Sequence, residues 1–163
     1  MLFRSVGSNW EIHVNGDEPF GARRHAIEAL TVRSHAHLQV ALLEDDTRAA
    51  EALVEAFRPL GIVATPYADS AALRAAIAHR RFDAYVLDWL LADGTAAGIV
   101  EEIRHHRAHI PVVVVTGALM ADSEMEKSLL ALSVQWNFST LDKPVRPMNL
   151  ANALKQLVAA ARA

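Results

Sequence analysis

Residues 39–46 read QVALLEDD, an apolar run followed directly by three acidic residues. A strand that is buried on both faces appears in a sequence as a continuous apolar run, without the alternation of a half-exposed strand. Such burial is typical of parallel sheets, which are covered by helices on both sides. The stretch therefore predicts a buried parallel strand, Gln39–Leu43, with negative charge at its carboxyl end.

Beyond this strand, predicted helices alternate with predicted strands. Strands are predicted at Ile62–Tyr67, Ala84–Leu87, Val112–Val115 and Asn137–Leu141, and helices at Thr47–Leu60, Ser70–His79, Thr95–Arg104, Ser123–Leu132 and Pro147–Arg162. This alternation is typical of an α/β fold, and right-handed crossovers place helices on both faces of the sheet. We therefore expect a doubly wound, five-stranded parallel sheet in residues 39–163.

Charged and hydroxyl side chains follow the predicted strands where those strands end. Glu44 and Asp45 follow the first strand, Asp88 the third, Thr116 the fourth and Lys143 the fifth. Ligands of open parallel sheets bind beyond the carboxyl ends of the strands. Several carboxylates at one edge repel one another unless a cation lies among them, and oxygen ligands with room for water suit Mg²⁺. The pattern indicates a magnesium site beside a lysine.

Each polar residue also has a structural interpretation. Asp46 precedes a predicted helix, so we interpret it as that helix's N-cap. Asp93-Gly94 is interpreted as a turn. The histidines at 105, 106 and 109 are interpreted as a solvated basic surface near a helix end, not as metal ligands. Taken singly, Glu44, Asp45 and Asp88 would also be interpreted as structural. What favours a functional site is that these acids, a hydroxyl and a lysine follow successive strands in this order.

Four short stretches occur in order on these elements: LLEDD (42–46), YVLDWLLADG (85–94), VVVVTGA (112–118) and LDKPV (141–145). Together they resemble the receiver domain of two-component response regulators, over roughly residues 39–160. The resemblance implies a flavodoxin-like receiver fold. It also implies a signalling domain that accepts a phosphoryl group and is not an enzyme acting on a separate substrate.

The resemblance implies the metal ligands by position. Asp45 would contact Mg²⁺ directly and Glu44 would act through water. Asp88 would share the metal, and the backbone carbonyl of Leu90 would be the third protein ligand.

The resemblance also implies the reacting groups. Asp88 matches the phosphoacceptor, which would receive its phosphoryl group from a sensor histidine kinase or a histidine phosphotransfer protein. Thr116 matches the switch hydroxyl, and Lys143-Pro144 matches a lysine–proline pair whose peptide bond is often cis in the family.

Some positions depart from the family pattern. Thr140 stands where the family usually has the aromatic residue that turns inward on activation, with Phe138 and Trp136 just before it. This departure favours an alternative, a receiver-fold interaction or dimerisation module in which phosphorylation is secondary. A second alternative is a phosphohydrolase of the haloacid-dehalogenase type, but the Asp-x-Asp spacing that such enzymes need on the first strand is absent.

Residues 1–38 form a separate extension of unknown role. Trp10, Ile12 and Val14 alternate with polar residues, as in a half-exposed strand. Asn15-Gly16 indicates a turn, and apolar residues from Ala22 to Leu30 recur at helical spacing. A strand and a helix cannot hold a core alone. We expect this extension to pack through its apolar stripe, across a homodimer.

Composition excludes several classes of protein. The chain has 163 residues, 52% of them hydrophobic, a formal net charge of −3 and no cysteine. This excludes a disordered chain, disulfides and thiolate metal sites. No stretch approaches the ~20 apolar residues of a membrane helix, and the start lacks the apolar run of a secretory signal. We expect a cytoplasmic domain that binds neither membranes nor nucleic acid.

Overall fold

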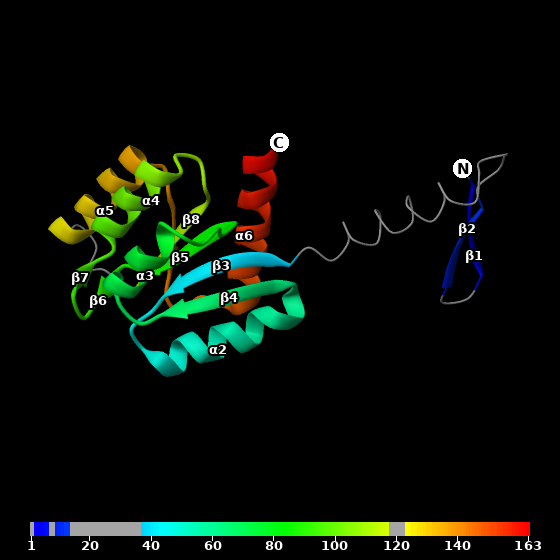
Figure 1. Ribbon diagram of the computed structural model, residues 1–163, viewed down its shortest axis with the longest axis horizontal. Helices are drawn as coiled ribbons and strands as arrows, with labels where there is room; N and C mark the ends of the chain where they lie inside the picture. Colours follow the sequence, from blue (N-terminus) through cyan, green and yellow to red (C-terminus); the bar gives the residue numbers. More distant parts are fainter. Residues whose placement is uncertain (1, 7–8, 14–36, 118–122) are drawn as a thin grey trace. The chain divides into compact units, whose positions relative to one another are not determined.

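The computed structural model describes residues 2–6, 9–13, 37–117 and 123–163 (Figure 1). The chain divides into two compact units, Met1–Ala36 and His37–Ala163. In the first unit, β1 (Leu2–Val6) pairs antiparallel with β2 (Asn9–His13). Strand β2 agrees with the predicted alternation around Trp10 and Ile12, whereas β1 was not predicted. The predicted turn and helix of the extension lie outside the described residues.

The second unit alternates strands and helices along the chain. Its main elements are β3 (Leu38–Leu43), α2 (Thr47–Phe57), β4 (Ile62–Tyr67), α3 (Ser70–Ile77), β5 (Ala84–Asp88), α4 (Ala97–His106), β8 (Val112–Thr116), α5 (Glu124–Trp136), β9 (Ser139–Asp142) and α6 (Pro147–Arg162). The strands form one parallel sheet in the order β4-β3-β5-β8-β9. The predicted fold class, a doubly wound five-stranded parallel sheet, is confirmed.

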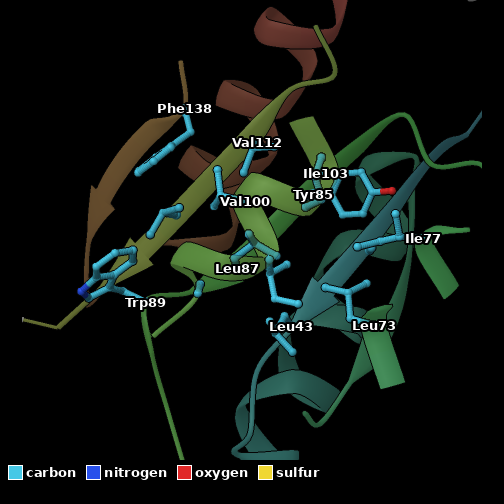
Figure 2. Close-up of a cluster of buried hydrophobic side chains, with 14 of the residues drawn as sticks. Leu43, Leu73, Ile77, Tyr85, Leu87, Trp89, Val100, Ile103, Val112 and Phe138 are labelled. Carbon is cyan, nitrogen blue, oxygen red and sulfur yellow. The ribbon is translucent and has the colours of Figure 1, made fainter. Parts of the chain in front are cut away.

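The two faces of the sheet bury alternate residues of the same strands. On one face, Leu43, Leu87 and Val114 pack with apolar side chains of α3, α4 and α5 (Figure 2). On the other face, Leu42 and Val86 belong to a second cluster with α2 and α6. Successive side chains of a strand point to opposite faces. Continuous apolar strands therefore supply both clusters at once, as the sequence predicts.

Some element boundaries differ from the predictions because a residue in the left-handed conformation ends the helical segment. The predicted helix to Leu60 is α2 followed by a 3₁₀ turn at Arg58–Leu60, which ends at Gly61 with φ of 74°. Helix α5 runs to Trp136 because Asn137, with φ of 49°, takes the left-handed conformation that ends it. The fifth strand therefore begins at Ser139, and the predicted start at Asn137 was wrong.

Arg104 connects α4 to the end of α5 and to the loop before β8. Its Nε donates to the carbonyl of Trp136, while Nη1 and Nη2 each donate over 2.7 Å to the carbonyls of Ile110 and Asn137. Two of these carbonyls lie at the end of α5, where helix carbonyls have no partner within the helix. Arg104 thus fixes the end of α5 just before β9 begins.

Among the described residues, no helix combines the length and apolar character needed to cross a membrane.

Candidate functional site

The carboxyl ends of three neighbouring strands, β3, β5 and β8, meet at one edge of the sheet. Glu44 follows β3, Asp88 is the last residue of β5 and Thr116 the last residue of β8. Backbone pairing continues past the strands, since the amide of Trp89 donates to the carbonyl of Val115 over 2.8 Å. Parallel register therefore brings residues that are distant in sequence to a common edge.

Three carboxylates meet at this edge. Glu44, Asp45 and Asp88 each place an oxygen within 4.8 Å of the others. Glu44 and Asp88 are buried, with 6% and 8% of their surface exposed, whereas Asp45 is exposed. Buried charges are costly unless they are paired or coordinate a cation. The site thus concentrates negative charge that needs a positive partner.

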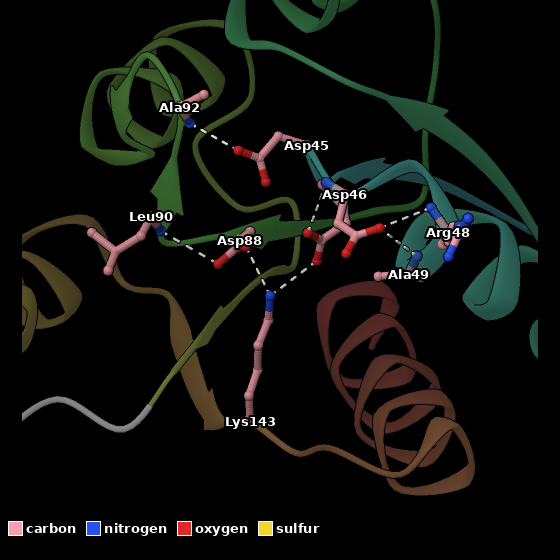
Figure 3. Close-up of polar contacts among 9 residues, drawn as sticks. Asp45, Asp46, Arg48, Ala49, Asp88, Leu90, Ala92 and Lys143 are labelled. Carbon is pink, nitrogen blue, oxygen red and sulfur yellow. Dashed lines mark hydrogen bonds and ion pairs between the residues drawn. The ribbon is translucent and has the colours of Figure 1, made fainter.

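Lys143 supplies one such partner (Figure 3). Its ammonium lies 2.8 Å from Oδ2 of Asp88 and 3.0 Å from Oε2 of Glu44. Burial acts to lower the pKa of Lys143, but its hydrogen bonds and charge interactions with Asp88 and Glu44 outweigh burial and raise the pKa. The Lys143 amide also donates to the Thr116 carbonyl over 2.7 Å, and the Lys143–Pro144 peptide bond is cis.

Asp45 is positioned by the loop that follows Asp88. Its Oδ2 accepts a hydrogen bond from the Ala92 amide over 2.9 Å (Figure 3). This loop contains a small antiparallel hairpin, β6 (Leu90–Leu91) and β7 (Gly94–Thr95), which was not predicted. Asp93 lies in the predicted turn, and its carboxylate also accepts hydrogen bonds from the amide and hydroxyl of Ser70. The hairpin is therefore held to the start of α3.

Asp46 belongs to the helix and not to the carboxylate cluster. Its Oδ1 accepts hydrogen bonds from the amides of Arg48 and Ala49 over 2.9 and 3.1 Å, which is the geometry of an N-cap. The interpretation of Asp46 as the N-cap of this helix is confirmed. The Asp46 amide in turn donates to Oε1 of Glu44 over 3.3 Å, so the same turn also orients Glu44.

Thr116 and Leu90 lie beside the carboxylates. The Thr116 side chain is buried, and its hydroxyl donates to the Gly117 carbonyl over 3.2 Å. The Leu90 amide donates to Oδ1 of Asp88 over 3.3 Å. The Leu90 side chain is 44% exposed and points away from the carboxylates (Figure 3). The predicted roles of the Thr116 hydroxyl and the Leu90 carbonyl stay predictions.

The aromatic residues around Thr140 take structural positions. Phe138 is buried in the core beneath α4 and α5. The ring of Trp136 lies 6.2 Å from that of His105 on α4. His105, His106 and His109 are exposed, as expected for a solvated surface. Thr140 is half-buried on β9.

The residues at the site fit a divalent cation. Glu44, Asp45 and Asp88 carry three negative charges and Lys143 carries one positive charge, which leaves a charge of −2. Carboxylate oxygens are the donors that Mg²⁺ prefers, with water completing its coordination. Asp45, which is exposed, gives such an ion access from solvent.

Sequence reasoning missed several contacts that build this site. It did not foresee the bond from Lys143 to Glu44, the Ala92 amide on Asp45 or the second role of Asp93. It also missed the burial of Trp89, whose side chain is 2% exposed and whose indole N–H has no partner in the described part of the chain. Trp89 directly follows the buried strand β5, and this position was the available signal that its side chain is buried.

Comparison with known proteins identifies receiver domains both by sequence family and by fold. The family model for the response regulator receiver domain matches residues 40–155. Among solved structures, a CheY-like receiver domain protein from Methanospirillum hungatei is 20% identical, with a TM-score of 0.68 over 77% of this chain and 96% of its own. Receiver proteins from Sinorhizobium medicae and Clostridium thermocellum are 17% and 18% identical, each with a TM-score of 0.66. They cover 76% and 77% of this chain, and 96% and 97% of their own. No significant match was found among curated proteins.

Proposed function

Because this chain belongs to the response regulator receiver domain family, we propose that it is a phosphoacceptor of a two-component phosphorelay. Asp88 would accept a phosphoryl group from a phosphohistidine of a sensor kinase or a phosphotransfer protein. The observation that carries this proposal is the position of the Asp88 carboxylate, 2.8 Å from the Lys143 ammonium and within a cluster of three acids.

The transfer is a displacement at phosphorus. An oxygen of Asp88 attacks, the bond between phosphorus and the imidazole nitrogen breaks, and the electron pair of that bond stays on the imidazole. The product is an acyl phosphate on Asp88. Such a reaction depends on positioning and on neutralising charge. The Leu90 amide on Oδ1 and the Lys143 ammonium on Oδ2 orient the carboxylate for this attack.

Lys143 and Thr116 would bind the new group. The Lys143 ammonium, a flexible point charge, would move from the Asp88 carboxylate to a phosphoryl oxygen. The Thr116 hydroxyl would leave the Gly117 carbonyl and donate to another oxygen. Glu44, Asp45, Asp88 and the Leu90 carbonyl would hold Mg²⁺, which supplies additional positive charge when bound.

Phosphorylation would then act as a switch. Movement of Thr116 shifts the end of β8, which is paired with β9, so both strands can respond. A partner that binds one arrangement better than the other would read the state of Asp88.

An interaction module in which phosphorylation is secondary is the second candidate. It is favoured by Thr140, whose short side chain lies on β9 where the family usually has an aromatic residue. In that case partner binding would not change when Asp88 is phosphorylated.

The test is phosphorylation by acetyl phosphate in the presence of Mg²⁺. Intact-mass measurement should show one added phosphoryl group that hydroxylamine removes, and none on the D88N variant. D93N is the matched control, because Asp93 lies in the adjacent loop and outside the carboxylate cluster. Equal labelling of D88N and the wild type would overturn the assignment.

A further inference from the structure

The two edges of the parallel sheet carry opposite charge. At the edge of the carboxylate site, the loops 44–46, 68–69 and 89–96 contain five acids and no lysine or arginine. At the opposite edge, the loops 78–83 and 107–111 lead from α3 into β5 and from α4 into β8. These two loops contain three arginines, Arg80, Arg81 and Arg107, and one acid, Asp83. A chain with a net charge of −3 thus has a basic edge, which we define by these two loops and the end of α6.

The loop arginines of the basic edge have no acidic partners in the described part of the chain. The side chains of Arg81, which is exposed, and Arg107, which is half-buried, form no hydrogen bond or ion pair with the described residues. Arg80 donates to the hydroxyl of Tyr67 over 3.1 Å, and its guanidinium carbon lies 5.2 Å from the centre of the Phe82 ring. Neutral groups therefore hold Arg80 in place without neutralising its charge.

A hollow of about 390 Å³ lies at the basic edge, between the loop 107–111 and the end of α6. Phe82, Pro111 and Val158 give it an apolar lining, and Arg107 and His109 line it as well. An apolar cavity of about 150 Å³ holds a benzene molecule, so this hollow has room for an apolar side chain and a neighbouring polar group. It thus combines apolar surface with positive charge.

The acid that lines this hollow is already paired. Oδ1 of Asp83 accepts a hydrogen bond from the guanidinium of Arg162, and Oδ2 accepts one from the amide of Gln39 over 2.8 Å. Both carboxylate oxygens therefore have partners within the fold. Arg107 is left as a cation of the hollow that an incoming carboxylate can pair with, and hydrogen bonds between charged groups are among the stronger ones.

A second hollow, of about 280 Å³, adjoins the first. It shares His109, Ile110 and Pro111 with the first hollow and extends toward Asn137 and Leu157. Side chains on one side of an extended chain recur about every 7 Å, so one extended segment can place a side chain in each of two adjacent hollows. A single small ion would leave most of this surface unused.

From these features we infer that the basic edge is a docking site for an extended acidic segment of a partner protein, with apolar residues flanked by glutamate or aspartate. An apolar side chain would enter the first hollow against Phe82 and Val158, and a flanking carboxylate would pair with Arg107. The apolar lining favours a peptide over nucleic acid, whose phosphates would gain nothing from it. Complementary charge would also speed the encounter with such a partner. This site lies at the edge opposite to Asp88 and does not depend on the proposed function.

The test titrates the peptide acetyl-Glu-Leu-Glu-Leu-Glu-amide into the full chain and follows methyl and amide NMR signals. The peptide should shift signals of Ile110 and Val158, and replacing its Glu by Gln or its Leu by Ser should weaken binding at least tenfold. R107E should weaken binding at least tenfold, and A108E, which adds a negative charge at the exposed rim of the hollow, at least threefold. R48E is the matched control and should bind within twofold of wild type, because Arg48 is exposed on α2 and lines neither hollow.

Equal binding of the Gln peptide, or binding that R107E and A108E leave unchanged, would overturn the docking site. A thymidine decanucleotide that binds more tightly than the peptide, and loses affinity in R107E, would assign the basic edge to nucleic acid and overturn the proposal as well. Peptide binding by a chain that acetyl phosphate fails to label would support the docking site while rejecting the proposed function. Labelling of a chain that does not bind the peptide would have the reverse meaning.

Discussion

The ammonium of Lys143 lies 2.8 Å from Oδ2 of Asp88, across 55 positions of sequence. The same ammonium also reaches Glu44. One cation therefore partly neutralises both buried acids of the site, and it lies against one of the two oxygens of the carboxylate that would accept the phosphoryl group. Removing Lys143 should affect both the chemistry of Asp88 and the stability of the fold.

The chemistry is tested with K143M. This variant loses the positive charge that orients Asp88 and that would bind a phosphoryl oxygen. Removing one preorganised group of this kind costs roughly 10²–10³ in rate, so phosphorylation by acetyl phosphate should slow by at least that order. K127M is the control, since the Lys127 ammonium forms an exposed ion pair with Glu124 and lies outside the carboxylate cluster. A K143M rate within a factor of two of wild type would contradict the assigned role.

The stability contributed by Lys143 should depend on pH. Its folded-state pKa is raised by Asp88 and Glu44. The contribution is therefore fully present below the unfolded-state pKa of about 10.4 and is lost as pH rises through the folded value. Urea unfolding should show wild type losing stability relative to K143M above about pH 10. A constant difference between the two proteins across that range would contradict this linkage.

Magnesium should stabilise the folded chain. The net charge of −2 among Glu44, Asp45, Asp88 and Lys143 is relieved by a bound divalent cation. At a concentration 100 times its Kd, such a ligand adds about 2.7 kcal/mol to the free energy of unfolding. The melting temperature should rise with MgCl₂ but not with NaCl of equal ionic strength, and D45N should reduce the rise. The same increase with both salts would argue against a specific site.

Arg104 should be important for stability because its guanidinium donates to three backbone carbonyls. Hydrogen bonds from charged groups each contribute roughly 1.5–3 kcal/mol, and the helix end is left without partners when they are lost. With Arg104 half-exposed, R104A should lower the free energy of unfolding by about 2–4 kcal/mol. R58A is the control, since Arg58 forms an exposed pair with Glu55 and should cost at most about 0.5 kcal/mol. Similar losses in the two variants would show that the three carbonyl contacts are not important.

The extension is proposed to mediate a homodimer. Apolar residues of β2 and of the segment after it would pack across two copies, because a unit of this size cannot bury them alone. Light scattering should give about twice the chain mass of 17.8 kDa. When residues 1–37 are deleted, it should give the mass of one shortened chain. If deletion leaves both the mass and the melting temperature unchanged, this extension does not mediate assembly.

The sequence by itself determined the sheet. Each continuous apolar run encodes a strand buried on both faces, and the alternation of strands with amphipathic helices encodes a doubly wound topology. The N-cap at Asp46 could also be predicted from the sequence, because its side chain accepts hydrogen bonds from amides only two and three positions away. Parallel register then required the strand-end acids to share an edge.

The tertiary structure decided what a local pattern cannot encode. Lys143 meets Glu44 across 99 positions, and the Ala92 amide meets Asp45 across 47. The end of α5 was misplaced because Asn137 and Arg104, 33 positions apart, fix it together. Sequence periodicity records which residues are buried, but contacts between elements depend on how those buried faces fit together.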